Sequence, residues 1–166
     1  MLLDPEAHDI YEVFKASLVV PGCYPEAVFL GDGEYLDGGT VNPLPVDFLL
    51  ESGMNRVVAI LSRPLDCESE PPNLLERAIL WRYFQRWDWM NETLWEAAEK
   101  YNQEISRLEE MSALTPPSSL IIAPERVPPA RFITRDRRKI NRTIDMGYQR
   151  AEALAGELQG ILLPGG

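Results

Sequence analysis

The chain has 166 residues, of which 45% are hydrophobic and 25% are charged, as expected for a single globular domain. Its formal net charge is −10, and most of the excess lies in residues 1–66, which carry three basic and eleven acidic side chains. Such an acidic segment repels polyanions, which argues against nucleic-acid binding. The chain has no apolar run near the roughly 20 residues that span a bilayer and only two cysteines, so we expect a cytoplasmic protein with reduced thiols.

The first elements expected along the chain are a short helix and a hairpin. Residues 6–17 have apolar side chains at helical spacing, with Asp4 as the candidate N-cap. The segment Gly31-Asp32-Gly33 then lies between the apolar pairs Phe29-Leu30 and Tyr35-Leu36. An Asp-Gly step between apolar runs is typical of a β-hairpin, so we expect two short antiparallel strands here.

A turn, a helix and a buried strand should follow the hairpin. In Asp37-Gly38-Gly39, the two glycines would allow positive φ angles and leave room for a ligand to approach. Pro43 and Pro45 fit the start of a helix that ends near Gly53. Residues 56–61, RVVAIL, are continuously apolar, as expected of a strand that is covered on both faces.

The rest of the chain is mostly helical in pattern. After a Pro-rich loop, we expect helices at about residues 73–87, 91–112 and 136–158, and a buried strand at 119–123, SLIIA. Strands covered on both faces normally belong to a parallel sheet of several strands, and few other strands are available here. We therefore expect that partner strands come from elsewhere and that the isolated chain exposes apolar surface.

The segment from about residue 16 to residue 64 resembles the patatin-like phospholipase family, most closely its bacterial branch. The match rests on Tyr35-Leu36-Asp37-Gly38-Gly39, then Asn42-Pro43-Leu44-Pro45-Val46, then the helix and the buried strand in the family's order. Lys15 to Pro25 resembles the helix end and Pro turn upstream in that family, and Arg135 to Tyr148 resembles its closing helix. The resemblance implies an α/β fold, namely a partial patatin-like fold with a few-stranded, mostly parallel sheet flanked by helices.

The same resemblance implies how the chain is divided and what it does. The whole chain would be the C-terminal part of one patatin-like domain, with an Asp-bearing core segment at 1–66, a helical hairpin at 67–115, and the last strand and closing helix at 116–166. Members of the family hydrolyse carboxylic esters of lipids with a Ser-Asp dyad and need no metal or organic cofactor. Asp37 occupies the position of the catalytic carboxylate.

The nucleophile of that dyad is missing. In the family it lies in a Gly-x-Ser-x-Gly elbow, and none of the eight serines in this chain has that setting. The chain would therefore supply Asp37 but not the Ser, and would be inactive alone. Its partners would be a lipid or acyl-ester substrate and either the missing N-terminal segment or a second copy. The alternative is a non-catalytic interaction module, or a degenerate hydrolase, that oligomerises through exposed sheet edges.

Several residues have simpler explanations that stay open. Without the family, Asp37 is explained as a turn former, and Asn42 either orders the turn or faces a pocket. His8, the only histidine, lies in an acidic segment, so a Ser-His-Asp triad within this chain is not expected. The acidic residues of GDGEYLDGG do not have the spacing of a calcium loop, so no metal site is expected.

Two surface features have two interpretations each. One basic run begins the last helix, and it either contacts anionic lipid headgroups, as a peripheral membrane contact, or is solvated and pairs with the acidic first part. The run consists of Arg131, Arg135, Arg137, Arg138, Lys139 and Arg142. The Trp-rich segment from Trp81 to Trp95 either packs between two helices or forms a lid over acyl chains.

Overall fold

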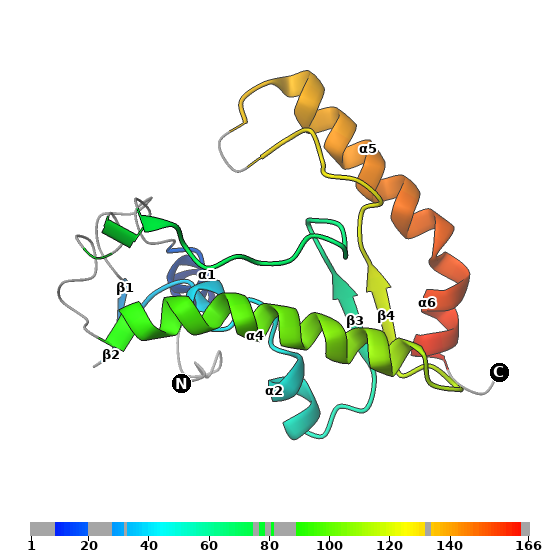
Figure 1. Ribbon diagram of the computed structural model, residues 1–166, viewed down its shortest axis with the longest axis horizontal. Helices are drawn as coiled ribbons and strands as arrows, with labels where there is room; N and C mark the ends of the chain where they lie inside the picture. Colours follow the sequence, from blue (N-terminus) through cyan, green and yellow to red (C-terminus); the bar gives the residue numbers. More distant parts are fainter. Residues whose placement is uncertain are drawn as a thin grey trace. The chain divides into compact units, whose positions relative to one another are not determined.

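The computed structural model describes residues 9–19, 28–31, 33–74, 77–78, 81, 89–131 and 134–163. Figure 1 shows helices and short strands mixed along the chain. The chain divides into two compact units, one made of residues 1–44 and 69–101, the other of residues 45–68 and 102–166. The fold class is thus mixed α and β, with a small parallel sheet flanked by helices in the second unit.

The first unit begins, in its described part, with helix α1, Ile10–Ser17. Asp9 has an extended backbone, and its carboxylate accepts a hydrogen bond from the Tyr11 N–H at 2.8 Å. The predicted helix therefore begins at Ile10, and Asp9 is its N-cap with an extended backbone, so the chain is not continuously helical through Asp9. The predicted N-cap Asp4 lies outside the described residues.

The predicted hairpin is confirmed in the first unit. Strand β1, Val28–Leu30, pairs antiparallel with β2, Gly33–Tyr35. Gly31 has a φ of 57° at the turn, a conformation that glycine adopts without steric penalty. The apolar residues of α1 and β1 form one core cluster, which consists of Ala16, Val19, Val28 and Leu30.

The second unit is built on a parallel strand pair. Strand β3, Val57–Ile60, pairs with β4, Ser119–Ile122, with Val57 opposite Ser119 and Ile60 opposite Ile122. Helix α2, Val46–Glu51, precedes β3. Helix α4, Trp89–Ser112, precedes β4 and contributes its second half to this unit. These elements match the predicted ranges to within a few residues.

Helices cover the two faces of this sheet differently. The Ser119 hydroxyl donates to the carbonyl of Leu108 at 2.6 Å, which ties one face to α4. Leu120 and Ile122 point to the opposite face and form a buried cluster with Leu154 and Ile161 from the end of the chain. The core of the second unit therefore lies mainly on β4.

The predicted single helix at 136–158 is two helices. Helix α5, Arg137–Ala153, ends at Leu154, whose backbone has a φ of −100° and a ψ of 7°, and α6, Ala155–Leu162, follows. Leu154 at the break and Ile161 in α6 both pack against Leu120 and Ile122 of β4.

The prediction that both strands are covered on both faces is wrong for β3. Ile60 is 77% exposed and Val58 is half-buried, whereas Val57 and Ala59 are buried. The cluster that Leu154 and Ile161 form with β4 packs against Val58 but leaves Ile60 exposed. Of the predicted helix at 73–87, the described residues 74, 77–78 and 81 are helical, and the Arg77 N–H donates to the carbonyl of Asn73 at 2.8 Å. The rest of that range, including residues 82–87 of the Trp-rich segment, lies outside the described residues, and Trp81 is exposed.

Candidate functional site

Asp37 is anchored through its backbone to the core of the first unit. It follows β2 and precedes the 3₁₀ turn η1, Gly38–Thr40. Its N–H donates to the carbonyl of Val19 at 3.0 Å, and its own carbonyl accepts from the Thr40 N–H at 3.0 Å. Because Val19 is buried, these bonds hold the Asp37 backbone in one place.

The carboxylate of Asp37 is half-buried and is held by its own turn. Its Oδ1 accepts a hydrogen bond from the Gly39 N–H at 2.7 Å, which makes Asp37 the N-cap of η1. The other carboxylate oxygen accepts no hydrogen bond from any described residue. One oxygen is therefore occupied and the other is available to a donor from outside.

The two glycines of the turn matter because they have no Cβ, and not because their backbone angles are unusual. Neither Gly38 nor Gly39 has a positive φ, so that expectation is wrong, because the turn is a short 3₁₀ helix. A Cβ on Gly39 would lie 3.0 Å from Asp37 Oδ1, whereas a Cβ on Gly38 would meet nothing within 4 Å. Gly39 thus allows the close approach of the carboxylate, and Gly38 leaves open space beside it.

Asn42 closes the same turn. Its backbone N–H donates to the carbonyl of Gly38 at 2.9 Å. Its Oδ1 is buried and accepts no hydrogen bond in the described part of the chain. The backbone of Asn42, and not its Oδ1, therefore ties it to the turn.

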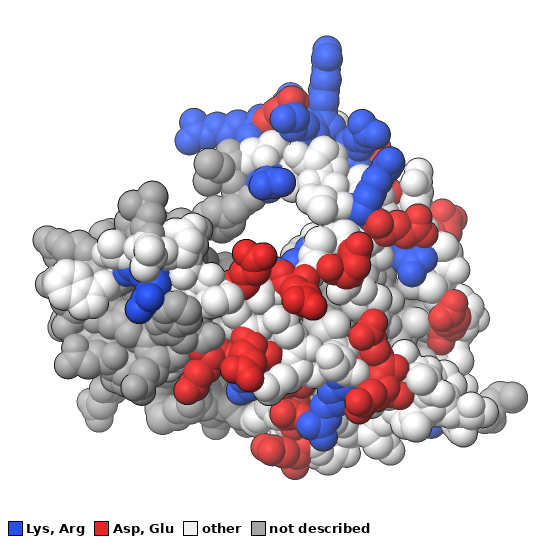
Figure 2. Space-filling model, viewed as in Figure 1, with Lys and Arg blue, Asp and Glu red and all other residues white. Residues whose placement is uncertain are grey.

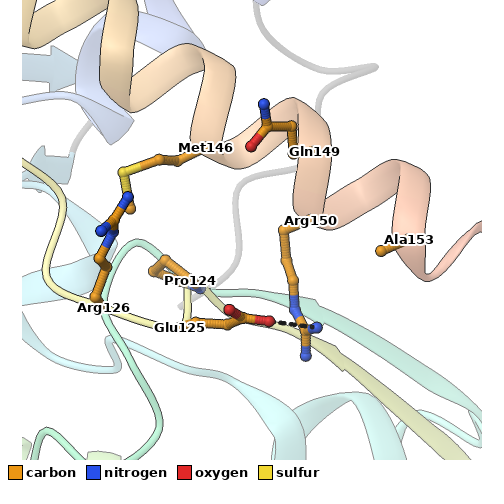
Figure 3. Close-up of a pocket in the computed structure, with 7 residues that line it drawn as sticks. All are labelled: Pro124, Glu125, Arg126, Met146, Gln149, Arg150 and Ala153. Carbon is orange, nitrogen blue, oxygen red and sulfur yellow. Dashed lines mark hydrogen bonds and ion pairs between the residues drawn. The ribbon is translucent and has the colours of Figure 1, made fainter.

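One hollow of about 540 Å³ lies in the second unit, between α5 and the segment that follows β4. Figure 3 shows Glu125 reaching toward Arg150 there, at 3.5 Å. Arg150 Nε also donates to the carbonyl of Ala123 at 3.0 Å. The hollow is lined by Pro124, Glu125, Arg126, Met146, Gln149, Arg150 and Ala153.

A second hollow, of about 780 Å³, borders β4 and is lined by residues of both helix layers, including Glu109 of α4 and Glu157 of α6. Asp37 lines neither hollow. Ser119 borders the second one, but it is buried and its hydroxyl is bonded to Leu108. Ser112 also borders this hollow, and its hydroxyl donates to the backbone carbonyl of Glu109 at 2.8 Å, so neither serine hydroxyl donates to a carboxylate there.

A buried carboxylate on α4 was not anticipated from the sequence. Glu104 is 2% exposed, and both its oxygens accept from the Asp47 N–H, at 3.1 and 3.2 Å, at the start of α2. Arg107, one turn further along α4, forms an ion pair with the Asp47 side chain. The available signal was the position of Glu104 within the apolar stripe between Tyr101 and Leu108.

Among the described residues, no three His, Cys, Asp or Glu side chains lie close enough together to hold a metal ion. None of the described helices combines the length and the apolar character needed to cross a bilayer. Comparison with protein-family models, curated proteins and solved structures finds no match to this chain.

Proposed function

We propose that this chain is the C-terminal part of a patatin-like lipid acyl hydrolase, in which Asp37 serves a Ser on a segment that the chain lacks. The observation that carries the proposal is the state of the Asp37 carboxylate. Its backbone is bonded to Val19, its Oδ1 is held by Gly39, and its second oxygen is free of described donors. A catalytic carboxylate needs this combination of a fixed position and an available oxygen.

In the proposed reaction, the Ser hydroxyl from the partner segment donates to the free oxygen of Asp37. As the Ser oxygen attacks the carbonyl carbon of the lipid ester, its proton passes to Asp37, which then delivers that proton to the leaving alkoxide. Water hydrolyses the acyl-Ser intermediate by the same route. The hydroxyl must lie about 2.6–3.2 Å from the carboxylate for this transfer.

The test is to express the chain together with the polypeptide encoded directly upstream that carries a Gly-x-Ser-x-Gly elbow. We expect turnover of p-nitrophenyl esters by the pair and not by the chain alone. Asp37→Asn should lower kcat of the pair by about 100-fold or more, because the amide keeps the cap but cannot take up the proton. The matched control is Asp9→Asn, since Asp9 caps α1 through the same kind of bond to the second following N–H.

Two results would contradict the proposal. Ester turnover by the chain alone that disappears in Asp37→Ala would place the nucleophile within these 166 residues. Equal turnover by the Asp37→Asn pair and the Asp9→Asn pair would leave Asp37 with a role in the turn only.

The second candidate is an interaction module, or a degenerate hydrolase, that self-associates through the edges of the β3–β4 sheet. It is favoured by the exposure of Ile60 at the end of β3 in a sheet with only two described strands. Light scattering separates the two candidates. A stable, soluble oligomer supports the module, and a monomer that aggregates until the N-terminal partner is added supports the divided hydrolase.

A further inference from the structure

Helix α5 exposes its apolar stripe to solvent. None of its residues is buried, although a helix on the surface of a domain normally turns such a stripe toward the core. Ile144 is 62% exposed and Tyr148, one turn further on, is 71% exposed. Ile140, one turn earlier, is half-buried. One face of α5 therefore carries three large apolar side chains, of which Ile144 and Tyr148 are mostly exposed and Ile140 is half-buried.

The opposite side of α5 is the one that packs against its own unit. Met146 and Arg150 line the hollow beside residues 124–126, as Figure 3 shows. Residues two positions apart on a helix differ by about 200° in direction, so Ile144 and Tyr148 point away from the side that carries these two. The exposure of the stripe thus follows from how α5 is attached.

Basic side chains surround the start of this helix. Residues 131–142 contain six basic residues and one acidic residue, Asp136, whose carboxylate is bonded to the Arg138 N–H at 2.9 Å. All six basic residues are exposed, and none forms an ion pair with a described acidic residue of the second unit. Figure 2 shows Lys and Arg side chains gathered where Figure 1 places the start of α5.

We propose that α5 binds the surface of an anionic lipid bilayer, with Ile140, Ile144 and Tyr148 inserted at the level of the headgroups and the basic residues contacting lipid phosphates and carboxylates. Interfacial helices combine an apolar stripe, low overall hydrophobicity and many Lys and Arg residues, and α5 has all three. The anionic leaflet attracts the basic side chains, and Tyr suits an apolar–polar boundary.

The basic side chains around the stripe favour an anionic bilayer over an apolar protein surface as the binding partner of α5. A protein that covered the stripe would have to neutralise or desolvate the neighbouring basic side chains, which is costly without matched acidic partners. An anionic bilayer offers the counter-charge and the apolar phase at the same depth. Membrane binding by α5 requires neither Asp37 nor ester turnover, so its test is independent of the test of the proposed hydrolase.

The test is co-sedimentation of the full chain with vesicles of phosphatidylcholine alone and of phosphatidylcholine mixed with phosphatidylserine. We expect binding only to the mixed vesicles, and release as the salt concentration rises. Arg138→Glu should lower the partition coefficient at least about fivefold, since each basic residue near the surface contributes about that factor. Lys15→Glu, an equal charge change on exposed α1, should leave it unchanged.

The apolar stripe is tested separately. Tyr148→Ser and Ile144→Ser should each lower the partition coefficient severalfold, whereas the control Tyr11→Ser, at a residue 79% exposed on α1, should not. Absence of binding to the mixed vesicles would overturn the proposal, as would α5 variants that behave like their α1 controls. Binding to soluble polyglutamate without binding to vesicles would also overturn it, and would indicate an acidic protein as the partner.

Discussion

At the scale of single residues, the turn at Asp37 combines a structural and a chemical property in one side chain. Oδ1 caps η1 through Gly39, and the second oxygen has no described donor. A side chain that only capped the turn would need an acceptor and no charge, so Asn would replace it fully. A member of a Ser-Asp dyad needs the charge as well. The substitution Asp37→Asn, which keeps an acceptor but removes the charge, therefore distinguishes the two roles.

Gly39 sets how closely this carboxylate can approach the turn. In Gly39→Ala the new Cβ would lie 3.0 Å from Asp37 Oδ1, so the carboxylate must shift and its bond must weaken. We expect Gly39→Ala to have a free energy of unfolding lower by about 1 kcal/mol than Gly38→Ala, the matched change at an open position. Urea denaturation followed by circular dichroism measures the difference, and equal values would contradict it.

At the scale of elements, α2 depends on a distant part of the chain. It has six residues, Pro45 precedes it, and no side chain of its own segment caps it. An isolated helix of this length is not stable. Glu104 of α4 accepts from the Asp47 N–H, and Arg107 pairs with the Asp47 carboxylate, so two consecutive turns of α4 hold the start of α2.

Removing the Glu104 carboxylate should expose this dependence. Because Glu104 is buried, we expect Glu104→Ala to lower the free energy of unfolding by about 2 kcal/mol, and Glu104→Gln to lower it less, since the amide still offers one acceptor. Glu110→Ala, at an exposed position on the same helix, should change it by less than about 0.5 kcal/mol. Equal effects at positions 104 and 110, measured by urea denaturation, would contradict the assignment.

The helices and strands whose formation depends on residues close by in the sequence could be predicted from it. The Asp-Gly step predicted the β1–β2 hairpin, and Val and Ile runs predicted β3 and β4. The cap of α2 was not predictable in this way, because its acceptor is 57 positions away. The break at Leu154 and the exposure of Ile60 depend likewise on which surfaces the tertiary structure covers.

At the candidate site, too, the features set by nearby residues could be predicted and those set by the tertiary structure could not. The position of a tight turn at Asp37 could be predicted, because an Asp followed by two glycines favours one. Its geometry could not, since Gly38 and Gly39 are compatible with a left-handed turn and with the 3₁₀ turn that is found. The bond from Asp37 to Val19 links residues that only the folded first unit brings together.

At the scale of the whole molecule, each unit has a small core and leaves large apolar side chains exposed. In the second unit, Ile60 and Ile122 lie opposite each other in register, yet Ile60 is 77% exposed and Ile122 is 7% exposed. Exposed apolar groups that gather beside an open strand favour association with other chains. The prediction that the isolated chain exposes apolar surface agrees with this pair.

The two isoleucines provide a matched test. Ile122→Ala should lower the free energy of unfolding by about 2–5 kcal/mol, since it leaves a cavity on β4, whereas Ile60→Ala should change it by less than about 0.5 kcal/mol. Ile60→Ala should instead reduce the fluorescence of a bound hydrophobic dye. Similar losses of stability for the two variants would show that Ile60 is covered in solution.

The parallel pairing also has a consequence for synthesis on the ribosome. Ser119 follows its partner Val57 by 62 positions, and the whole of α4 is translated between them. Until β4 emerges, nascent β3 presents an apolar strand with neither edge satisfied, a state in which growing chains are prone to misassembly. The yield of native protein should therefore depend on how quickly translation reaches residue 122, and on chaperones that shelter β3 during that interval.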